Sequence, residues 1–215
     1  MVVKDTCFVL DRFLIGENTL LGKCYFQKLG KRKIIIPKYF SNFKIGSFEP
    51  FNVIKLYLIQ RGDTLQPLDV INISFNSKRI AQNYQRFLFL SKVSKIILEF
   101  INEADHEIFK VLLLTIKIND FFSFNYIRFL LNLTHILGFS IENLNRPGWI
   151  NLLNLSNCRP EEFKNSYCIY IHPKEFALLK KISEPYTKPF EIDRKIERNI
   201  EVFFYKFLEF RKEQF

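Results

Sequence analysis

The distribution of glycine and proline is the feature that most constrains the fold of this chain. Five of the seven glycines lie in the first 62 residues, and Pro37, Pro50 and Pro67 lie in the first 67. No further glycine occurs until Gly138, and no further proline until Pro147. Frequent turn-forming residues favour short strands, whereas a long segment without them favours helices. The sequence therefore predicts a β-rich part up to about residue 76 and a helical part after it.

Five strands are expected in the first part, joined by turns such as Lys28–Lys31 and Arg61–Thr64. Side chains alternate most clearly in the fourth strand, where Val53, Lys55 and Tyr57 face one way. Five strands in about 70 residues match a small closed barrel such as the OB-fold, with an open β-sandwich fragment as the alternative. The predicted strands are Thr6–Arg12, Thr19–Gln27, Arg32–Ile36, Phe51–Gln60 and Leu65–Phe75.

The second part carries apolar residues at helical spacing. Residues 139–172 are expected to be irregular, because Pro147 and Pro160 interrupt them. The fold class is therefore α+β, with an OB-fold domain at 1–76 and a helical domain at 77–215. The predicted helices are Ser77–Asn102, Asp105–Ile118, Phe124–Leu137, Pro173–Ile182 and a last helix with Ile192, Ile196, Ile200, Phe203, Phe204, Phe207 and Leu208 on its apolar stripe.

Composition and charge limit the class of protein. The chain has 215 residues, of which 48% are hydrophobic, so intrinsic disorder is excluded. No apolar stretch approaches the roughly 20 residues of a membrane span, and the N-terminus has no signal-peptide pattern. A soluble cytoplasmic protein with no membrane partner is expected. The formal net charge of +10 favours a polyanionic partner, although it is also compatible with simple solubility.

The segment Asn18–Phe48 concentrates this charge, because it contains seven cations and no Asp or Glu. Aromatic residues lie between the cations. Single-stranded nucleic acids are bound by cations that contact phosphates and by rings that stack on bases. The alternative is that the rings form the barrel core and the lysines a solvated face. The predicted DNA-binding residues are Lys23, Lys28, Lys31, Arg32, Lys33, Lys38, Lys44, Tyr39 and Phe40.

The cysteines do not form a recognisable metal site. Cys158, Cys168 and His172 are weak zinc candidates, because a structural zinc site normally uses closely spaced cysteine pairs. Cys7 and Cys24 lie in apolar, strand-like surroundings and are expected to be buried. We therefore expect reduced thiols, no zinc and no other cofactor.

Catalytic signatures are also scarce. The chain has no phosphate-binding glycine loop, no G-x-S-x-G and no H-E-x-x-H motif. Asp193 and Lys195, with Glu191 nearby, are superficially similar to the carboxylate–lysine ends of some nucleases. In an amphipathic helix Glu191 and Lys195 instead form an ordinary i,i+4 pair. The expectation is a protein that is not an enzyme, with a nuclease as the alternative.

Four short motifs follow one another along the chain: Val9–Leu20 with a Gly-Glu turn, the basic Pro37–Ser41, Phe48–Phe51 with its Glu-Pro pair, and Leu130–Phe139 ending in Gly-Phe. The order of these parts resembles the RecO family of bacterial recombination mediators. Val9–Leu20 looks like that family's first two strands, and Pro37–Ser41 is similar to its basic loop. Phe48–Phe51 matches its Leu-Glu-Pro-Phe-like signature, and Leu130–Phe139 its helix ending in Gly-Phe. Two features depart from the family pattern. Ile34–Pro37 replaces the start of the basic loop, and only two cysteines remain of a four-cysteine zinc module, which predicts a degenerate, metal-free insert at about 139–172.

The resemblance implies a DNA repair and recombination protein of the bacterial cytoplasm, associated with the nucleoid. Such proteins bind single- and double-stranded DNA and anneal complementary strands. With RecR they help RecA to load onto DNA coated with single-strand-binding protein. The alternative is a generic OB-fold protein that binds single-stranded DNA or RNA without mediator activity.

Overall fold

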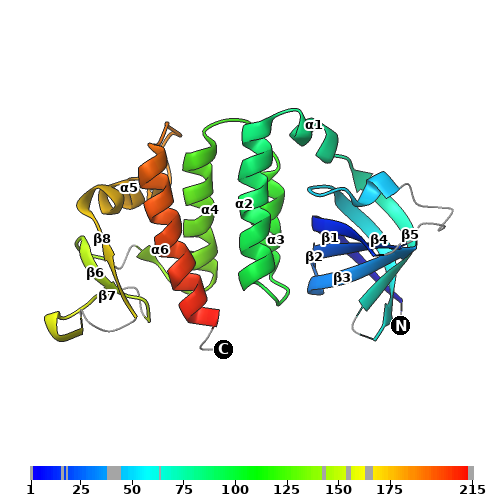
Figure 1. Cartoon of the computed structure of the whole chain (residues 1–215), viewed down its shortest axis with the longest axis horizontal. Coiled ribbons are helices and arrows are strands. Elements are labelled where there is room, and N and C mark those ends of the chain that lie inside the picture. Colours follow the sequence, from blue (N-terminus) through cyan, green and yellow to red (C-terminus); the bar gives the residue numbers. More distant parts are fainter. Residues whose placement is uncertain are drawn as a thin grey trace. The chain divides into compact units, whose positions relative to one another are not determined.

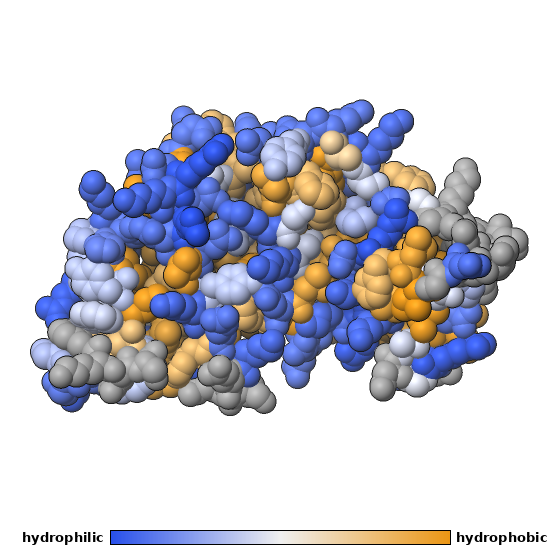
Figure 2. All heavy atoms as spheres, in the orientation of Figure 1, coloured by the Kyte–Doolittle hydropathy of each residue, from blue (hydrophilic) through white to orange (hydrophobic). Residues whose placement is uncertain are grey.

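The computed structural model describes residues 2–15, 17, 19–37, 45–62, 64–141, 144–153, 156–162 and 167–212. Five strands come first along the chain, and helices with three further short strands follow (Figure 1), so the predicted α+β class is confirmed. Hydrophilic side chains cover much of the face seen in Figure 2, with smaller apolar areas between them. Among the described residues, no helix combines the length and the apolar character needed to cross a membrane.

The first five strands form a closed barrel in the order β1-β2-β3-β5-β4. Neighbouring strands pair antiparallel except β3 and β5, which pair in parallel. All five predicted strands are present, but β1 extends beyond the predicted range at both ends. The reason is that β1 closes the barrel by pairing with both β2 and β4. The strands are β1 (Val2–Ile15), β2 (Thr19–Phe26), β3 (Gly30–Pro37), β4 (Val53–Arg61) and β5 (Thr64–Ser74).

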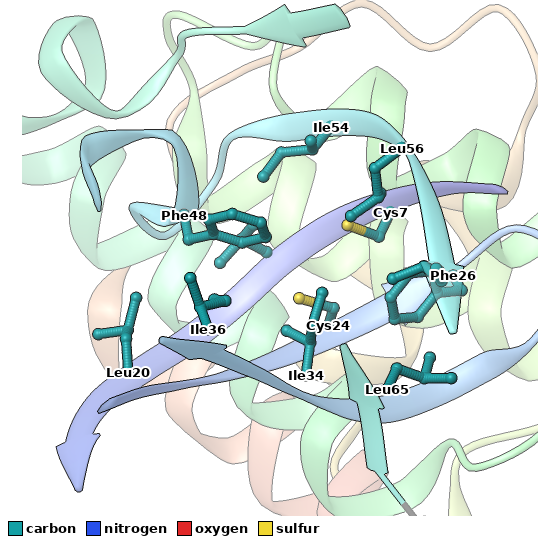
Figure 3. Close-up of a cluster of buried hydrophobic side chains, with 12 residues drawn as sticks. Cys7, Leu20, Cys24, Phe26, Ile34, Ile36, Phe48, Ile54, Leu56 and Leu65 are labelled. Atoms are coloured by element: carbon teal, nitrogen blue, oxygen red, sulfur yellow. The ribbon is translucent and has the colours of Figure 1, made fainter. Parts of the chain in front are cut away.

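Alternate residues of these strands fill the barrel. In β4 the residues Ile54, Leu56 and Leu58 are buried, and those between them are more exposed, which confirms the predicted alternation. Figure 3 shows Cys7 and Cys24 directed into the same cluster from β1 and β2. Both thiols are free and buried, as predicted. The barrel interior is therefore an apolar core, and any ligand must bind to the outside of the barrel.

One buried asparagine joins the barrel to the first helix. Asn52 is fully buried, and its Oδ1 accepts hydrogen bonds from the backbone N–H groups of Asn76 at 2.8 Å and Ser77 at 3.0 Å. Its Nδ2 donates to two carbonyls of the 3-10 turn η1 (Ile45–Phe48), at 3.0 and 3.1 Å. The same side chain therefore positions η1 and the start of α1 (Ser77–Ala81).

The helix predicted from Ser77 to Asn102 is interrupted, so that prediction is wrong in its length. A second helix, α2 (Tyr84–Phe100), follows α1 after a break at Asn83. Asn83 has an extended backbone, and its side chain accepts a hydrogen bond from Arg86 N at 3.0 Å. Asparagine favours such N-cap positions over helix interiors, which explains the break. The next helix, α3 (His106–Thr115), begins after the N-cap Asp105, where the sequence predicts it.

The helices α1–α3 belong with the barrel. The chain divides into two compact units, Met1–Ile118 and Asn119–Phe215. The predicted domain boundary at residues 76 and 77 coincides with the end of β5 and the start of α1, and not with the division between the units. The difference arises because the barrel and the connection between α2 and α3 are joined by contacts that the sequence does not reveal.

These contacts are hydrogen bonds to the α2–α3 connection. The Tyr25 hydroxyl donates to the carbonyl of Glu103 and accepts from the N–H of Asp105, both at 2.9 Å. The backbone N–H of Lys31 donates to the carbonyl of Asn102 at 2.9 Å. Because both strands of the β2–β3 hairpin take part, the connection is fixed against the barrel.

The described residues of the second unit include the helices α4 (Phe122–Ile136), α5 (Pro173–Ser183) and α6 (Arg194–Lys212). The apolar stripe of α6 is buried from Ile200 to Leu208, as its spacing predicts. Ile192, which was predicted to lie on this helix, precedes its first residue, because the helix begins only after the cap at Asp193. Polar contacts connect α4 with α6: Ser123 Oγ donates to Glu197 at 2.6 Å, and the Tyr126 hydroxyl donates to Glu201 at 3.0 Å.

The region predicted to be irregular, 139–172, contains a small sheet in the order β7-β6-β8. Its strands have only two to four residues, too few to produce a recognisable periodicity. A disulfide joins Cys158 to Cys168, so the prediction of reduced thiols is wrong for this pair. The two cysteines meet because β7 and β8 both pair with β6, which the sequence does not signal. The elements are β6 (Gly148–Asn151), β7 (Ser156–Asn157), the 3-10 turn η3 (Pro160–Glu162) and β8 (Cys168–Ile171).

Candidate nucleic-acid interface

Two lysines face each other across β2 and β3. In the register of these strands Lys23 lies opposite Lys33, and both point outward because the alternate residues Cys24 and Ile34 are in the core. Like charges at directly opposed positions destabilise a sheet. An anion bound between them would relieve this repulsion. The opposed pair is therefore the first indication of an anion-binding face, which we call the β2–β3 face.

The lysine pair borders a hollow of about 400 Å³ on the barrel unit. Its other described lining residues are Lys31, Arg32 and Leu98, so four of the five described lining residues are cations. A second hollow of about 340 Å³ also includes Arg32, with Leu29, Gln60, Thr64 and Leu65. The first hollow offers positive charge, and the second adds an amide and a hydroxyl. Together they have the chemistry of a surface that binds phosphates and neighbouring polar groups.

The four cations differ in how strongly the protein engages them. Lys31 Nζ donates to the carbonyl of Leu98 at 2.6 Å, so this ammonium group is held against α2. Lys23 Nζ lies 3.6 Å from an Asp11 carboxylate oxygen, at ion-pair distance. Arg32 and Lys33 are exposed, and Arg32 donates to the carbonyl of Lys31 at 2.9 Å. Arg32 and Lys33 are accordingly the cations most open to a ligand, Lys23 is partly neutralised, and Lys31 has a structural role as well.

Of the remaining predicted site residues, the structure describes Lys28, which does not line this hollow. Lys28 is exposed in the β2–β3 turn, and its backbone N–H donates to Asp5 Oδ2 at 3.1 Å. Asp5 is buried, and this burial raises the pKa of its carboxyl, against the effect of backbone donors that include Thr6 and Lys28. The predicted residues Lys38, Tyr39, Phe40 and Lys44 lie outside the described residues.

The described aromatic residues of the basic segment belong to the protein interior. Tyr25, Phe26 and Phe48 are fully buried, so they do not stack on a ligand, and their interpretation as core residues is right. Burial raises the pKa of Tyr25 to about 12. The buried phenol is therefore a hydrogen-bonding group that joins the barrel to the α2–α3 connection.

Sequence reasoning missed several residues of the site. Leu98 completes the wall of the first hollow from α2, and only the packing of α2 beside β3 brings it there. Gln60 and Thr64 flank the β4–β5 turn and join the second hollow through the barrel closure. Asp11 of β1 lies directly opposite Lys23 of β2. Pairing the first two predicted strands in this register would have found it.

The weak zinc candidates do not form a ligand set in this structure. The sulfur atoms of Cys158 and Cys168 are bonded to each other, and a disulfide sulfur is not the thiolate that binds zinc. The ring of His172 packs edge-to-face on Tyr170, with 4.9 Å between the centroids. Within the described ranges, no group of three or more His, Cys, Asp or Glu side chains is arranged to hold a metal ion.

The residues of the nuclease alternative have a local structural role. Asp193 Oδ1 accepts hydrogen bonds from the backbone N–H groups of Lys195 at 2.9 Å and Ile196 at 3.3 Å. This is the geometry of an aspartate N-cap, here at the start of α6. Helix capping therefore accounts for Asp193.

Comparisons with known proteins give a relative but no function. No family model matches the chain. A protein of Aquifex aeolicus (strain VF5), described as uncharacterized, is 31% identical over 140 residues. The alignment covers 64% of this chain, and the chain spans 65% of the length of that protein. The chain is thus similar to a bacterial protein over part of its length.

Proposed function

We propose that this chain is a DNA-binding recombination mediator of the RecO type and not an enzyme. The observation that carries the proposal is the opposed pair Lys23–Lys33 at the edge of a hollow lined by four cations. The barrel supports it, because five strands in the order β1-β2-β3-β5-β4 are the arrangement of an OB-fold, which commonly binds nucleic acids. The resemblance in the order of sequence motifs supplies the specific family.

In this proposal the β2–β3 face binds the phosphate backbone. Each contact between a cation and a phosphate releases condensed counterions, which provides affinity that does not depend on base sequence. Neutralising the backbone also lowers the repulsion between two complementary strands, so that they can anneal. Tyr39 and Phe40 would stack on bases, in the role that the sequence predicts for them.

The partners of such a mediator are proposed from the resemblance alone. They are single- and double-stranded DNA, RecR and single-strand-binding protein, with RecA assisted indirectly. The protein would act in the bacterial cytoplasm at the nucleoid. A generic single-strand or RNA-binding protein would share the cationic face but would lack annealing activity on coated strands.

Strand annealing tests the proposal. Complementary oligonucleotides coated with single-strand-binding protein are mixed with the chain, and duplex formation is followed by fluorescence quenching. We expect annealing to be accelerated by the wild type and strongly reduced by Lys23→Gln/Lys33→Gln. The matched control Lys188→Gln/Lys195→Gln removes two exposed lysines of the second unit and should anneal like the wild type.

A mediator and a generic binding protein give different results in this assay. If the chain binds DNA but does not anneal coated strands, the generic binding protein is the better interpretation. Failure of the wild type to bind DNA would overturn the proposal as a whole.

A further inference from the structure

A second exposed surface of the barrel unit combines aromatic rings with positive charge. Its rings are Phe75, Tyr84 and Phe87, which are 60%, 70% and 42% exposed. A group of exposed apolar side chains marks a binding surface, whereas single ones do not. Two cations and one further apolar residue lie among the rings. We call this the α1–α2 surface, and its members are Phe75, Lys78, Arg79, Tyr84, Phe87 and Leu88.

The rings come together around Phe51. The Phe87 ring packs edge-to-face on the buried Phe51 ring, with 5.8 Å between the centroids and 82° between the planes. Asn76, which follows Phe75, donates from Nδ2 to the Phe51 carbonyl at 3.4 Å. Tyr84 lies three residues before Phe87 and therefore on the same face of α2. The Phe87 ring is thus held in place before any ligand binds, which lowers the entropic cost of binding.

The sequence around these rings is cationic. The segment from Val70 to Leu98 contains five Lys or Arg residues and no Asp or Glu. Lys78 and Arg79 are exposed, and neither forms an ion pair with a residue that the structure describes. Burial lowers the pKa of the Arg86 guanidinium, and the charge of the nearby Arg79 lowers it further. The α1–α2 surface therefore attracts an anionic partner.

This surface is separate from the β2–β3 face and differs from it in chemistry. It lies at the start of α2, next to α1 (Figure 1). Leu98, which lines the cationic hollow, is in the last turn of α2. A rise of about 1.5 Å per residue places Leu98 about 21 Å from Tyr84 along the helix. The described lining of the hollow contains no aromatic ring, so only the α1–α2 surface offers both rings and charge among these residues.

We propose that the α1–α2 surface binds the unpaired bases of single-stranded DNA and gives the protein a preference for single strands. Its rings stack on bases of any sequence, and Lys78 and Arg79 contact the neighbouring phosphates. In a duplex the bases are already stacked and paired, so the rings do not reach them, whereas the β2–β3 face contacts the phosphates of either form. The inference rests on the proposed DNA binding and adds a selectivity that phosphate contacts alone do not provide.

Fluorescence anisotropy with the full chain tests the role of the rings, using a thymidine oligonucleotide and a hairpin duplex without single-stranded ends. In Tyr84→Leu, which keeps apolar area but removes the ring, the affinity for the single strand should fall by about ten-fold, the effect of losing one stacked base. The duplex affinity should be unchanged. Tyr84→Phe keeps the ring and should bind like the wild type. The matched control Tyr186→Leu removes an exposed ring of the second unit and should change neither affinity.

The salt dependence of the same binding tests the cations. In Lys78→Gln/Arg79→Gln the slope of log K against log salt for the single strand should become shallower by about 1.4, from about 0.7 per contact. The slope for the duplex should stay unchanged. The matched control Arg194→Gln/Lys195→Gln removes an exposed Arg and Lys from the first turn of α6 and should keep both slopes. An unchanged single-strand slope in Lys78→Gln/Arg79→Gln would contradict phosphate contacts at this surface.

The outcomes separate this inference from the proposed function. If the wild type binds both DNAs and Tyr84→Leu binds the single strand equally tightly, or loses duplex affinity to the same degree, the inference is wrong and the proposed function is unaffected. The exposed rings would then fit an acidic protein partner. If Tyr84→Leu weakens single-strand binding and Lys23→Gln/Lys33→Gln does not, the inference holds and the β2–β3 face is wrong. If the wild type binds neither DNA, both fail.

Photocrosslinking of the wild type to a single-stranded oligonucleotide containing 5-iodouracil gives an answer that does not depend on the folding of a variant. We expect crosslinks at Tyr84 or Phe87. Crosslinks confined to other residues would overturn the inference.

Discussion

Replacing Gly30 with alanine should destabilise the barrel unit far more than the same change at Gly62. Both glycines have positive φ angles, +68° and +59°, so alanine carries a similar backbone cost of about 1–2 kcal/mol at either position. At Gly62 nothing lies within 4 Å of the added Cβ. At Gly30 the Cβ would lie 2.5 Å from the backbone nitrogen of Ala104 and 2.7 Å from the carbonyl oxygen of Asn102. The two variants therefore differ mainly in this collision.

The size of the difference follows from the geometry. Ordinary Cβ contacts begin at 3.4 Å, so the α2–α3 connection must move by about 0.9 Å, the difference from the closest approach. Overpacking of this kind costs about 1–3 kcal/mol. Loss of the hydrogen bond from Lys31 N to Asn102 O adds about 1 kcal/mol. We expect Gly30→Ala to be less stable than Gly62→Ala by about 2–4 kcal/mol.

Urea denaturation followed by far-UV circular dichroism measures this difference. Hydrogen exchange at the Lys31 amide provides a local readout and should accelerate in Gly30→Ala alone. Equal unfolding free energies for the two variants, with unchanged exchange at Lys31, would refute the close packing of the β2–β3 hairpin on the α2–α3 connection.

Three other changes test separate parts of the structure. Since the pKa of Tyr25 is raised from about 10 to about 12, the unfolded chain loses its proton first, and stability should fall by about 1.4 kcal/mol per pH unit above pH 10 relative to Tyr25→Phe. Urea titrations of the two proteins at pH 8 to 11 measure this difference, and an equal loss of unfolding free energy in both proteins would contradict it. Lys33→Gln should stabilise the barrel by about 0.2–1 kcal/mol, because it removes repulsion from Lys23; a lower midpoint in urea would count against the opposed pair. Reduction of Cys158–Cys168, which are separated by 10 residues, should lower the stability of the second unit by about 2–3 kcal/mol. The fluorescence of the chain's one tryptophan, in β6, reports this unfolding. If dithiothreitol leaves the stability unchanged, the result would argue against the disulfide.

The strands of the barrel could be predicted because local signals agree with the final structure. Gly30 and Gly62 mark turns that need positive φ angles, and β4 alternates because one of its faces fills the core. The break at Asn83 was missed because a helical stripe continues across it, although asparagine itself favours capping. The sheet at β6–β8 was missed because its strands are too short for a pattern.

The candidate site could be predicted only in part. The cations of β2 and β3 are evident from composition, but their strand register is needed to place Lys23 opposite Lys33. The participation of Leu98 depends on packing between elements far apart in the sequence. Long-range contacts of this kind leave no local trace in the sequence.

The salt dependence of DNA affinity tests the central claim most directly. Binding of a fluorescent single-stranded oligonucleotide is measured over a range of salt concentrations for the wild type and for Lys23→Gln/Lys33→Gln. If both lysines contact phosphates, the slope of log K against log salt should become shallower by about 1.4, from about 0.7 per contact. The Lys188→Gln/Lys195→Gln control should keep the wild-type slope. An unchanged slope in a folded Lys23→Gln/Lys33→Gln variant would contradict DNA binding by the β2–β3 face.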